Sequence, residues 1–151
     1  MQVSLPFEVR NRIKALLRTA GRREIGGILM GEQLEPGRFR IVDFSVDTIS
    51  GTAAHFVRSP EHHGEALQAF FERTGYAFGR FNYLGEWHSH PCFPARPSQE
   101  DVQSMEELVH GERDIHFALL LIVRLRWMVC LDYSATVFIR HGNPQPVAVS
   151  S

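Results

Sequence analysis

Two histidines and one aspartate have the types and the spacing of metal ligands. His88 and His90 lie in the segment Glu86-Trp87-His88-Ser89-His90-Pro91, which is predicted to end a strand. Because side chains alternate along a strand, the two imidazoles point to the same side. Asp101 follows at the start of a predicted helix. Two nitrogens and one carboxylate oxygen leave a fourth position open to water, which is typical of catalytic rather than structural zinc sites.

Each half of this pattern also has an ordinary explanation. A pair of histidines on a strand is usually a pair of surface side chains. Ser98 with Asp101 three residues later is typical of a capping box, in which each residue satisfies a backbone amide of the other. The two halves are separated by the seven residues 91–97. Their combination favours a metal site over two unrelated features.

A hydrolytic zinc site also needs a base that receives a proton from the attacking water. Glu24 is one candidate, because Gly26 and Gly27 permit a close backbone approach that could carry its carboxylate into the interior. A solvated surface charge is the ordinary interpretation of this residue. Glu86 is the second candidate, since alternation places it on the side of the histidines, where it could instead orient one of them. Cys92 could compete for zinc, although a half-buried loop thiol is the simpler interpretation.

The elements that must position these residues follow from hydrophobic periodicity and from turn residues. Helices are predicted at residues 5–20, 60–75 and 98–111. Strands are predicted at residues 26–31, 38–46, 55–58, 83–90, 115–124, 127–132 and 135–140, with a loop at 92–97. This order predicts an α+β fold, a mixed β-sheet flanked by helices.

Length and composition exclude several classes of protein. The 151 residues fit one domain, 1–151, and a net charge of −1 argues against a nucleic-acid partner. Two cysteines are too few for a disulfide framework. The longest apolar run, residues 117–123, is too short to span a membrane. No signal peptide is visible, so a cytoplasmic location is expected.

The complete pattern resembles the JAMM motif of the JAB/MPN zinc metalloprotease family. The matching residues are Glu24, Gly26, Gly27, His88, Ser89, His90, Pro91, Ser98 and Asp101. The resemblance implies that His88, His90 and Asp101 bind Zn²⁺. It implies that Glu24 is the general acid/base acting on the attacking water, and that Ser98 holds that water or the developing oxyanion. The implied JAB/MPN fold is a sheet flanked by helices, related to that of cytidine deaminases.

The resemblance also implies a class of substrate. Similar proteins cleave peptide or isopeptide bonds after the C-terminal Gly of a ubiquitin-like protein, in its conjugates or its precursor. The sequence of residues 83–91 is similar to that of JAB peptidases from bacterial operons that also encode ubiquitin-like activating and conjugating enzymes. CBASS-type antiphage systems are among these operons. The first expected partner is therefore a ubiquitin-like protein with a C-terminal Gly, together with its conjugates. The activating and conjugating enzymes of such an operon are a second, weaker expectation.

Two alternatives remain open at this point, and a third is excluded by the sequence. One is C-terminal processing of a sulfur-carrier protein, which would use the same residues. Another is a non-catalytic JAB scaffold, although such scaffolds typically lose motif residues. A zinc nucleotide deaminase would need a Pro-Cys-x-x-Cys segment, and Cys92 is followed by Phe-Pro-Ala without a second cysteine.

Overall fold

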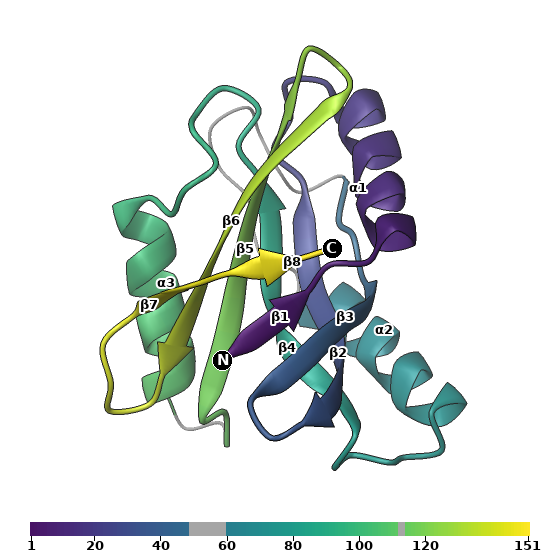
Figure 1. Ribbon diagram of the computed structural model, residues 1–151, viewed down its shortest axis with the longest axis vertical. Coiled ribbons are helices and arrows are strands. Elements are labelled where there is room, and N and C mark those ends of the chain that lie inside the picture. The colour runs from purple at the N-terminus through teal and green to yellow at the C-terminus, as the bar shows by residue number, and fades with distance from the viewer. Residues whose placement is uncertain (49–59, 112–113) are drawn as a thin grey trace.

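The computed structural model describes residues 1–48, 60–111 and 114–151, with the backbone alone at 60–62 (Figure 1). The helices of these residues are α1 (Phe7–Ala20), α2 (Pro60–Arg73) and α3 (Gln99–His110). The strands are β1 (Gln2–Ser4), β2 (Gly26–Glu35), β3 (Arg38–Phe44), β4 (Phe81–Ser89), β5 (Phe117–Arg126), β6 (Cys130–Ile139), β7 (Gln145–Val147) and β8 (Val149–Ser150). Within the described ranges they form one mixed sheet in the order β7-β6-β5-β4-β2-β3-β1-β8. None of these helices has the length and apolar character needed to cross a membrane.

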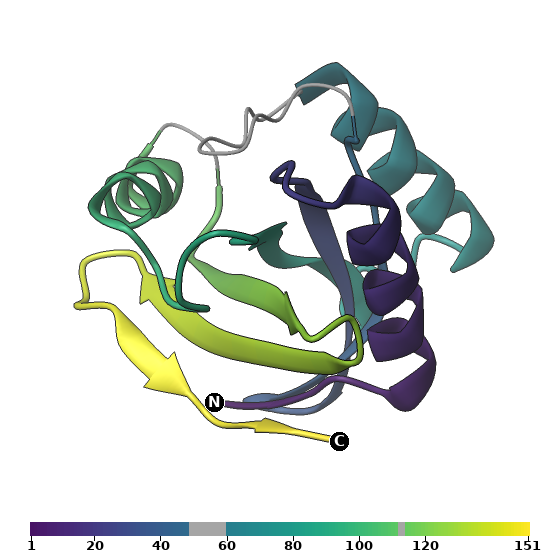
Figure 2. The same cartoon turned by 90° about the horizontal axis from the view of Figure 1, so that it is seen from above.

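The two faces of the sheet carry different layers. On one face, Ile13 and other apolar residues of α1 pack with Trp87 of β4 in the largest core cluster. On the other face, α3 packs on Leu120 and Ile122 of β5, and α2 packs on β2, with Tyr83 shared between these two clusters. Figure 2 shows α3 near β6 and β7 at one side of the curved sheet, and α1 and α2 at the other side. Alternation along β4 therefore turns Trp87 toward α1 and its neighbours toward the face that α2 and α3 cover.

Most predicted elements are confirmed with small shifts of their ends. The first helix begins at Phe7 rather than at residue 5, because Pro6 is its N-cap. The strand predicted at 26–31 continues to Glu35, and the strand predicted at 83–90 begins at Phe81. The strand predicted at 55–58 lies outside the described residues, as does Ser59, which the sequence predicts as the N-cap of the helix at 60–75. The mixed sheet flanked by helices agrees with the predicted α+β class.

The end of the sheet was predicted wrongly in two respects. The strands predicted at 127–132 and 135–140 are the single strand β6, since Trp127 and Met128 form the turn that precedes it. No strand was predicted in the tail after β6, but this tail contains β7, which pairs with β6, and β8, which pairs with β1. One short segment therefore pairs with strands at both ends of the sheet order, which shortens the unpaired strand edges (Figure 1).

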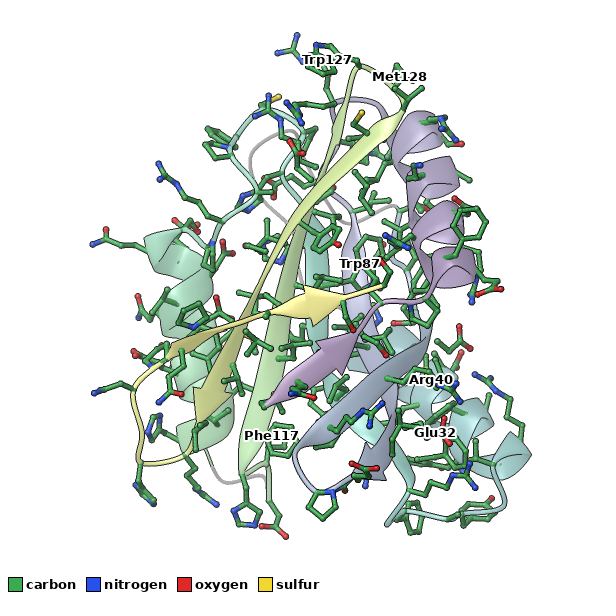
Figure 3. All side chains as sticks on the ribbon, in the orientation of Figure 1. Glu32, Arg40, Trp87, Phe117, Trp127 and Met128 are labelled. Atoms are coloured by element: carbon green, nitrogen blue, oxygen red, sulfur yellow. The ribbon has the colours of Figure 1, made fainter. Side chains whose placement is uncertain are left out.

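An ion cluster around one buried carboxylate links β2 to β3 and to the segment before β4. The Glu32 side chain is 1% exposed and accepts hydrogen bonds from Arg40 and from Arg80, the latter at 2.8 Å from Nε (Figure 3). Burial alone would raise the pKa of Glu32, but the two guanidinium groups outweigh it and hold this pKa below its ordinary value of 4.5. The ionised carboxylate therefore stabilises the folded state.

Replacing this carboxylate is expected to cost stability in a pH-dependent way. Glu32→Gln should lower the free energy of unfolding at pH 7 by about 1–2 kcal/mol, since hydrogen bonds to a charged group are lost. Because the pKa of Glu32 is lowered on folding, its contribution is complete above pH 4.5 and is lost as the pH falls below that value. Urea unfolding of both proteins at pH 7 and near pH 3 measures the difference.

Glu35→Gln is the matched control for this experiment. The Glu35 side chain is 67% exposed and lies 3.6 Å from Arg38, so its ion pair is screened by water. The control should change the free energy of unfolding by less than about 0.5 kcal/mol at either pH. An equal loss in both variants would contradict the role assigned to Glu32.

Candidate metal centre

The structure brings the three predicted ligands together at the end of β4. His88 Nε2 lies 3.2 Å from His90 Nε2 and 3.0 Å from Asp101 Oδ1. His90 Nε2 lies 3.4 Å from Asp101 Oδ2. Both histidines are buried and Asp101 is nearly so, and one ligand atom from each residue falls within 4.8 Å of the others. This group could hold a metal ion.

The donor set and its spacing fit zinc. Tetrahedral zinc with bonds near 2.0 Å separates neighbouring ligand atoms by about 3.3 Å. The atom pairs here lie 3.0–3.4 Å apart. Two imidazole nitrogens and a carboxylate oxygen are all electron-pair donors, so their close approach needs a cation or a proton among them. The three residues therefore suit an ion that retains an open fourth position.

The loop after β4 fixes the tautomer of His90. His90 Nδ1 lies 3.0 Å from the carbonyl oxygen of Pro94, which can only accept, so Nδ1 carries the hydrogen. Nε2 is then left with its lone pair directed at the site, as a metal ligand requires. Burial lowers the pKa of His90, but the hydrogen bonds to Asp101 and Pro94 and the charge of Glu24 raise it above its ordinary value.

Asp101 is held by the capping box of α3. Ser98 Oγ accepts from the backbone amide of Asp101 at 3.1 Å, and the Ser98 amide donates to Asp101 Oδ2 at 2.7 Å. Asp101 is thus both a member of the helix cap and a candidate metal ligand. Burial raises the pKa of Asp101, but the hydrogen bonds from both histidines and from the Ser98 amide lower it far below its usual range.

Glu24 is carried into the interior beside these residues. It is buried, which excludes the interpretation as a solvated charge, and it is close enough for its charge to raise the pKa of His90. The next residue, Ile25, donates its amide to Ser89 Oγ at 3.0 Å and accepts from the Ser89 amide at 2.8 Å. A Cβ on Gly26 would lie 2.3 Å from the Trp87 carbonyl oxygen, so this approach requires glycine, as the sequence predicted.

The other polar residues considered for a role in the chemistry differ in burial and in their contacts. Glu86 is buried on the same face as His88 and lines a groove of about 990 Å³ between α2 and α3. Cys92 is exposed rather than half-buried, and it is not in the group that could hold a metal. His63 is also buried, with Nδ1 2.7 Å from Ser45 Oγ, and this contact joins segments that are too far apart in the sequence for residue spacing to indicate it.

Residues 6–135 match the family model described as prokaryotic homologs of the JAB domain. The chain belongs to this family. The JAB domain family includes JAMM metalloproteases as well as non-catalytic members, so membership is compatible with a peptidase or isopeptidase role but does not by itself show one. No curated protein matches the sequence.

Solved structures with TM-scores of 0.69 and 0.59 share the fold of this JAB-family chain. A protein from Desulfitobacterium hafniense, determined in solution, is 22% identical with a TM-score of 0.69, over 99% of this chain and 94% of that one. A protein from Salinibacter ruber is 18% identical with a TM-score of 0.59, over 99% and 90%. A JAB1/MPN domain protein from Archaeoglobus fulgidus is 17% identical with a TM-score of 0.47, over the full length of both chains.

The capping box of this JAB domain gives a stability prediction. Ser98→Ala removes the oxygen that accepts from the Asp101 amide, so the free energy of unfolding should fall by about 1 kcal/mol. Ser98→Thr keeps a hydroxyl cap and should lose less than about 0.5 kcal/mol. Denaturant unfolding of the metal-free proteins measures the cap alone. An Ala variant as stable as the wild type would show that the cap contributes nothing.

Proposed function

We propose that this chain is a zinc-dependent isopeptidase or peptidase that cleaves after the C-terminal Gly of a ubiquitin-like protein. The observation that carries the proposal is the convergence of His88, His90 and Asp101 at one buried point, with Glu24 in electrostatic range. A non-catalytic scaffold would have no need for this complete set. The family match supports the peptidase class, and the substrate is the finer part of the proposal.

Each residue of the site has a defined task in this proposal. His88, His90 and Asp101 hold the ion, and the Pro94 carbonyl and the Ser98 cap orient two of these ligands. A bound zinc ion supplies Lewis-acid chemistry, activating water near neutral pH and polarising the scissile carbonyl. Glu24 takes a proton from the attacking water and delivers it to the leaving amine.

The predicted substrate is an extended chain that ends in glycine. A carbonyl carbon can reach the ion only if the peptide lies extended across the end of β4. An extended peptide is most simply held by main-chain hydrogen bonds to a strand. Residues just before the cut then pass close to the protein backbone, where a β-carbon would collide, and glycine alone has none. A Gly-Gly tail joined to a lysine amine or to another peptide meets this requirement.

The test is a panel of fusions incubated with the zinc-loaded protein. Ubiquitin and several bacterial ubiquitin-like domains, each ending in Gly-Gly, are joined through the last Gly to a reporter, and mass spectrometry locates the cut. We expect cleavage directly after the last Gly of at least one fusion, inhibited by a zinc chelator. Changing that Gly to Ala in the same fusion should slow cleavage roughly tenfold or more.

Two results would contradict the proposal. Equal rates for the Gly and Ala fusions, or faster cutting of unstructured peptides than of any fusion, would indicate a general peptidase. Intact fusions after long incubation with the zinc-loaded protein would favour a scaffold instead.

A further inference from the structure

The turn between β5 and β6 exposes three consecutive apolar residues. Trp127 is 76% exposed, Met128 is 57% exposed, and Val129 is exposed to the same degree as Met128. We call these three residues the hairpin tip. Figure 3 shows Trp127 and Met128 at the far end of the hairpin, whereas Trp87 lies in the interior. Single exposed apolar side chains are ordinary, but a contiguous group is typical of an interaction surface.

The backbone of the hairpin tip is unfavourable for the residues that form it. The Val129 amide donates to the Arg126 carbonyl oxygen at 3.1 Å, which closes a turn with Trp127 and Met128 at its centre. Their φ angles are 49° and 63°, in the left-handed region that hairpin turns normally fill with Asn-Gly or Asp-Gly. Large side chains held in a strained turn indicate that the side chains, rather than the turn, serve a purpose.

The hairpin tip extends past the candidate metal centre. β4 and β5 are parallel, and Ser89 at the end of β4 is paired with Val123. Trp127 follows Val123 by four residues and lies just past the end of β5, about 13 Å beyond the end of β4 at about 3.3 Å per residue. If a folded domain reaches the site through an extended tail of about five residues, the body of the domain stays within about 17 Å of the candidate metal centre. The hairpin tip therefore lies within reach of such a domain.

The hairpin tip is held in place and has a basic border. Arg18 of α1 donates from Nε to the Met128 carbonyl oxygen at 2.9 Å, which ties the turn to the helix. The Arg126 guanidinium stacks 4.7 Å above the Trp127 ring and pairs with Asp132, and Arg124 faces Asp132 across the two strands. The guanidinium groups of Arg18, Arg124 and Arg126 outnumber the single carboxylate of Asp132. This excess of positive charge favours a partner whose apolar patch is bordered by acidic residues.

We propose that the hairpin tip is the docking surface for the folded domain of the substrate, an inference that rests on the proposed function. The domain's apolar patch covers Trp127 and Met128, its acidic border faces the arginines, and its C-terminal tail runs back to the end of β4. Docking selects a folded ubiquitin-like domain over a free peptide with the same tail.

The two tryptophans of the chain allow binding to be measured without turnover. Isotope-labelled, zinc-loaded Glu24→Gln protein is titrated with each domain of the panel, and the two indole N–H signals are followed by NMR. The Trp127 signal should shift saturably with the domain whose fusion is cleaved, and the shift should weaken with added salt. The signal of Trp87, which is fully buried, should stay in place.

A double variant whose sequence favours this type of turn separates an effect on docking from an effect on folding. Trp127→Asn combined with Met128→Gly gives the hairpin a favourable turn sequence, so the melting temperature should not fall. We measure kcat/KM for the cleaved fusion and for a peptide that has only the last six residues of its domain and carries the same reporter. The ratio of the first value to the second should drop roughly tenfold or more in the double variant, mainly through KM. Phe7→Ser is the matched control, because Phe7 is 66% exposed and lies at the start of α1, whereas Arg18, which contacts the hairpin tip, lies in its last turn. This control should leave the ratio unchanged.

The outcomes distinguish this inference from the proposed function. Cleavage of a fusion with an unmoved Trp127 signal, or an unchanged ratio in the double variant, would overturn the docking surface and leave the peptidase intact. A saturable Trp127 shift with no cleavage of any fusion would support the docking surface and overturn the proposed function.

Discussion

Glu24→Gln is expected to reduce turnover by about 10²–10⁴-fold while the protein keeps its fold and its zinc. The amide has the shape of the carboxylate, so the packing around the buried side chain is retained, but it cannot accept a proton from the attacking water. The cleaved fusion gives the rate, and atomic spectroscopy of the same preparation gives the zinc content. A loss of turnover with zinc still bound is the signature of a group that transfers protons rather than one that holds the ion.

Glu86→Gln is the control for this assignment. Glu86 is buried on the same face as His88, so the same substitution perturbs a comparable carboxylate close to the site. We expect its effect on turnover to be much smaller than that of Glu24→Gln. If Glu24→Gln keeps nearly normal rates and Glu86→Gln is inactive, the proton acceptor is Glu86.

Removing a ligand should instead abolish zinc binding and activity together. His88→Ala or Asp101→Ala leaves two protein donors where the catalytic arrangement has three. We expect the zinc content to fall from about one ion per chain to a small fraction of that, with cleavage at background. Dialysed proteins are compared by atomic spectroscopy, with circular dichroism to verify the fold.

His116→Ala is the matched control for the ligand variants. Its side chain is 73% exposed and lies beside Asp114 at the start of β5 rather than at the end of β4. This variant should keep both zinc and activity. A full complement of zinc in His88→Ala and Asp101→Ala would contradict the ligand assignment.

The convergence of the site could be predicted because its parts are local in the sequence. Strand alternation predicts that His88 and His90 lie on one side, and the capping box places Asp101 at the start of a helix. In the structure β4 ends at Ser89, but the two imidazoles still lie 3.2 Å apart, and the capping box is present. What brings Glu24 to them is a contact across the sheet, the pairing of Ile25 with Ser89. Gly26 indicated a close approach, but the partner of that approach depends on the packing of two strands that are distant in the sequence.

The remaining errors have a common physical cause. β1, β7 and β8 are two or three residues long, too short to show an alternating pattern, and each forms only because a neighbouring strand offers an edge. Trp127 was assigned to a strand because aromatic residues favour strands and the turn contains neither glycine nor asparagine. Tertiary contacts override local preference at these places.

The central claim, hydrolysis that depends on zinc at this site, is tested most directly by titrating zinc into metal-free protein. Cleavage of the fusion should rise in proportion to added zinc and level off at about one equivalent per chain, as three ligands and one ion require. The Asp101→Ala protein should remain inactive at the same zinc concentrations. Full cleavage by the metal-free protein in the presence of a chelator, or a rise that Asp101→Ala shares, would contradict the account.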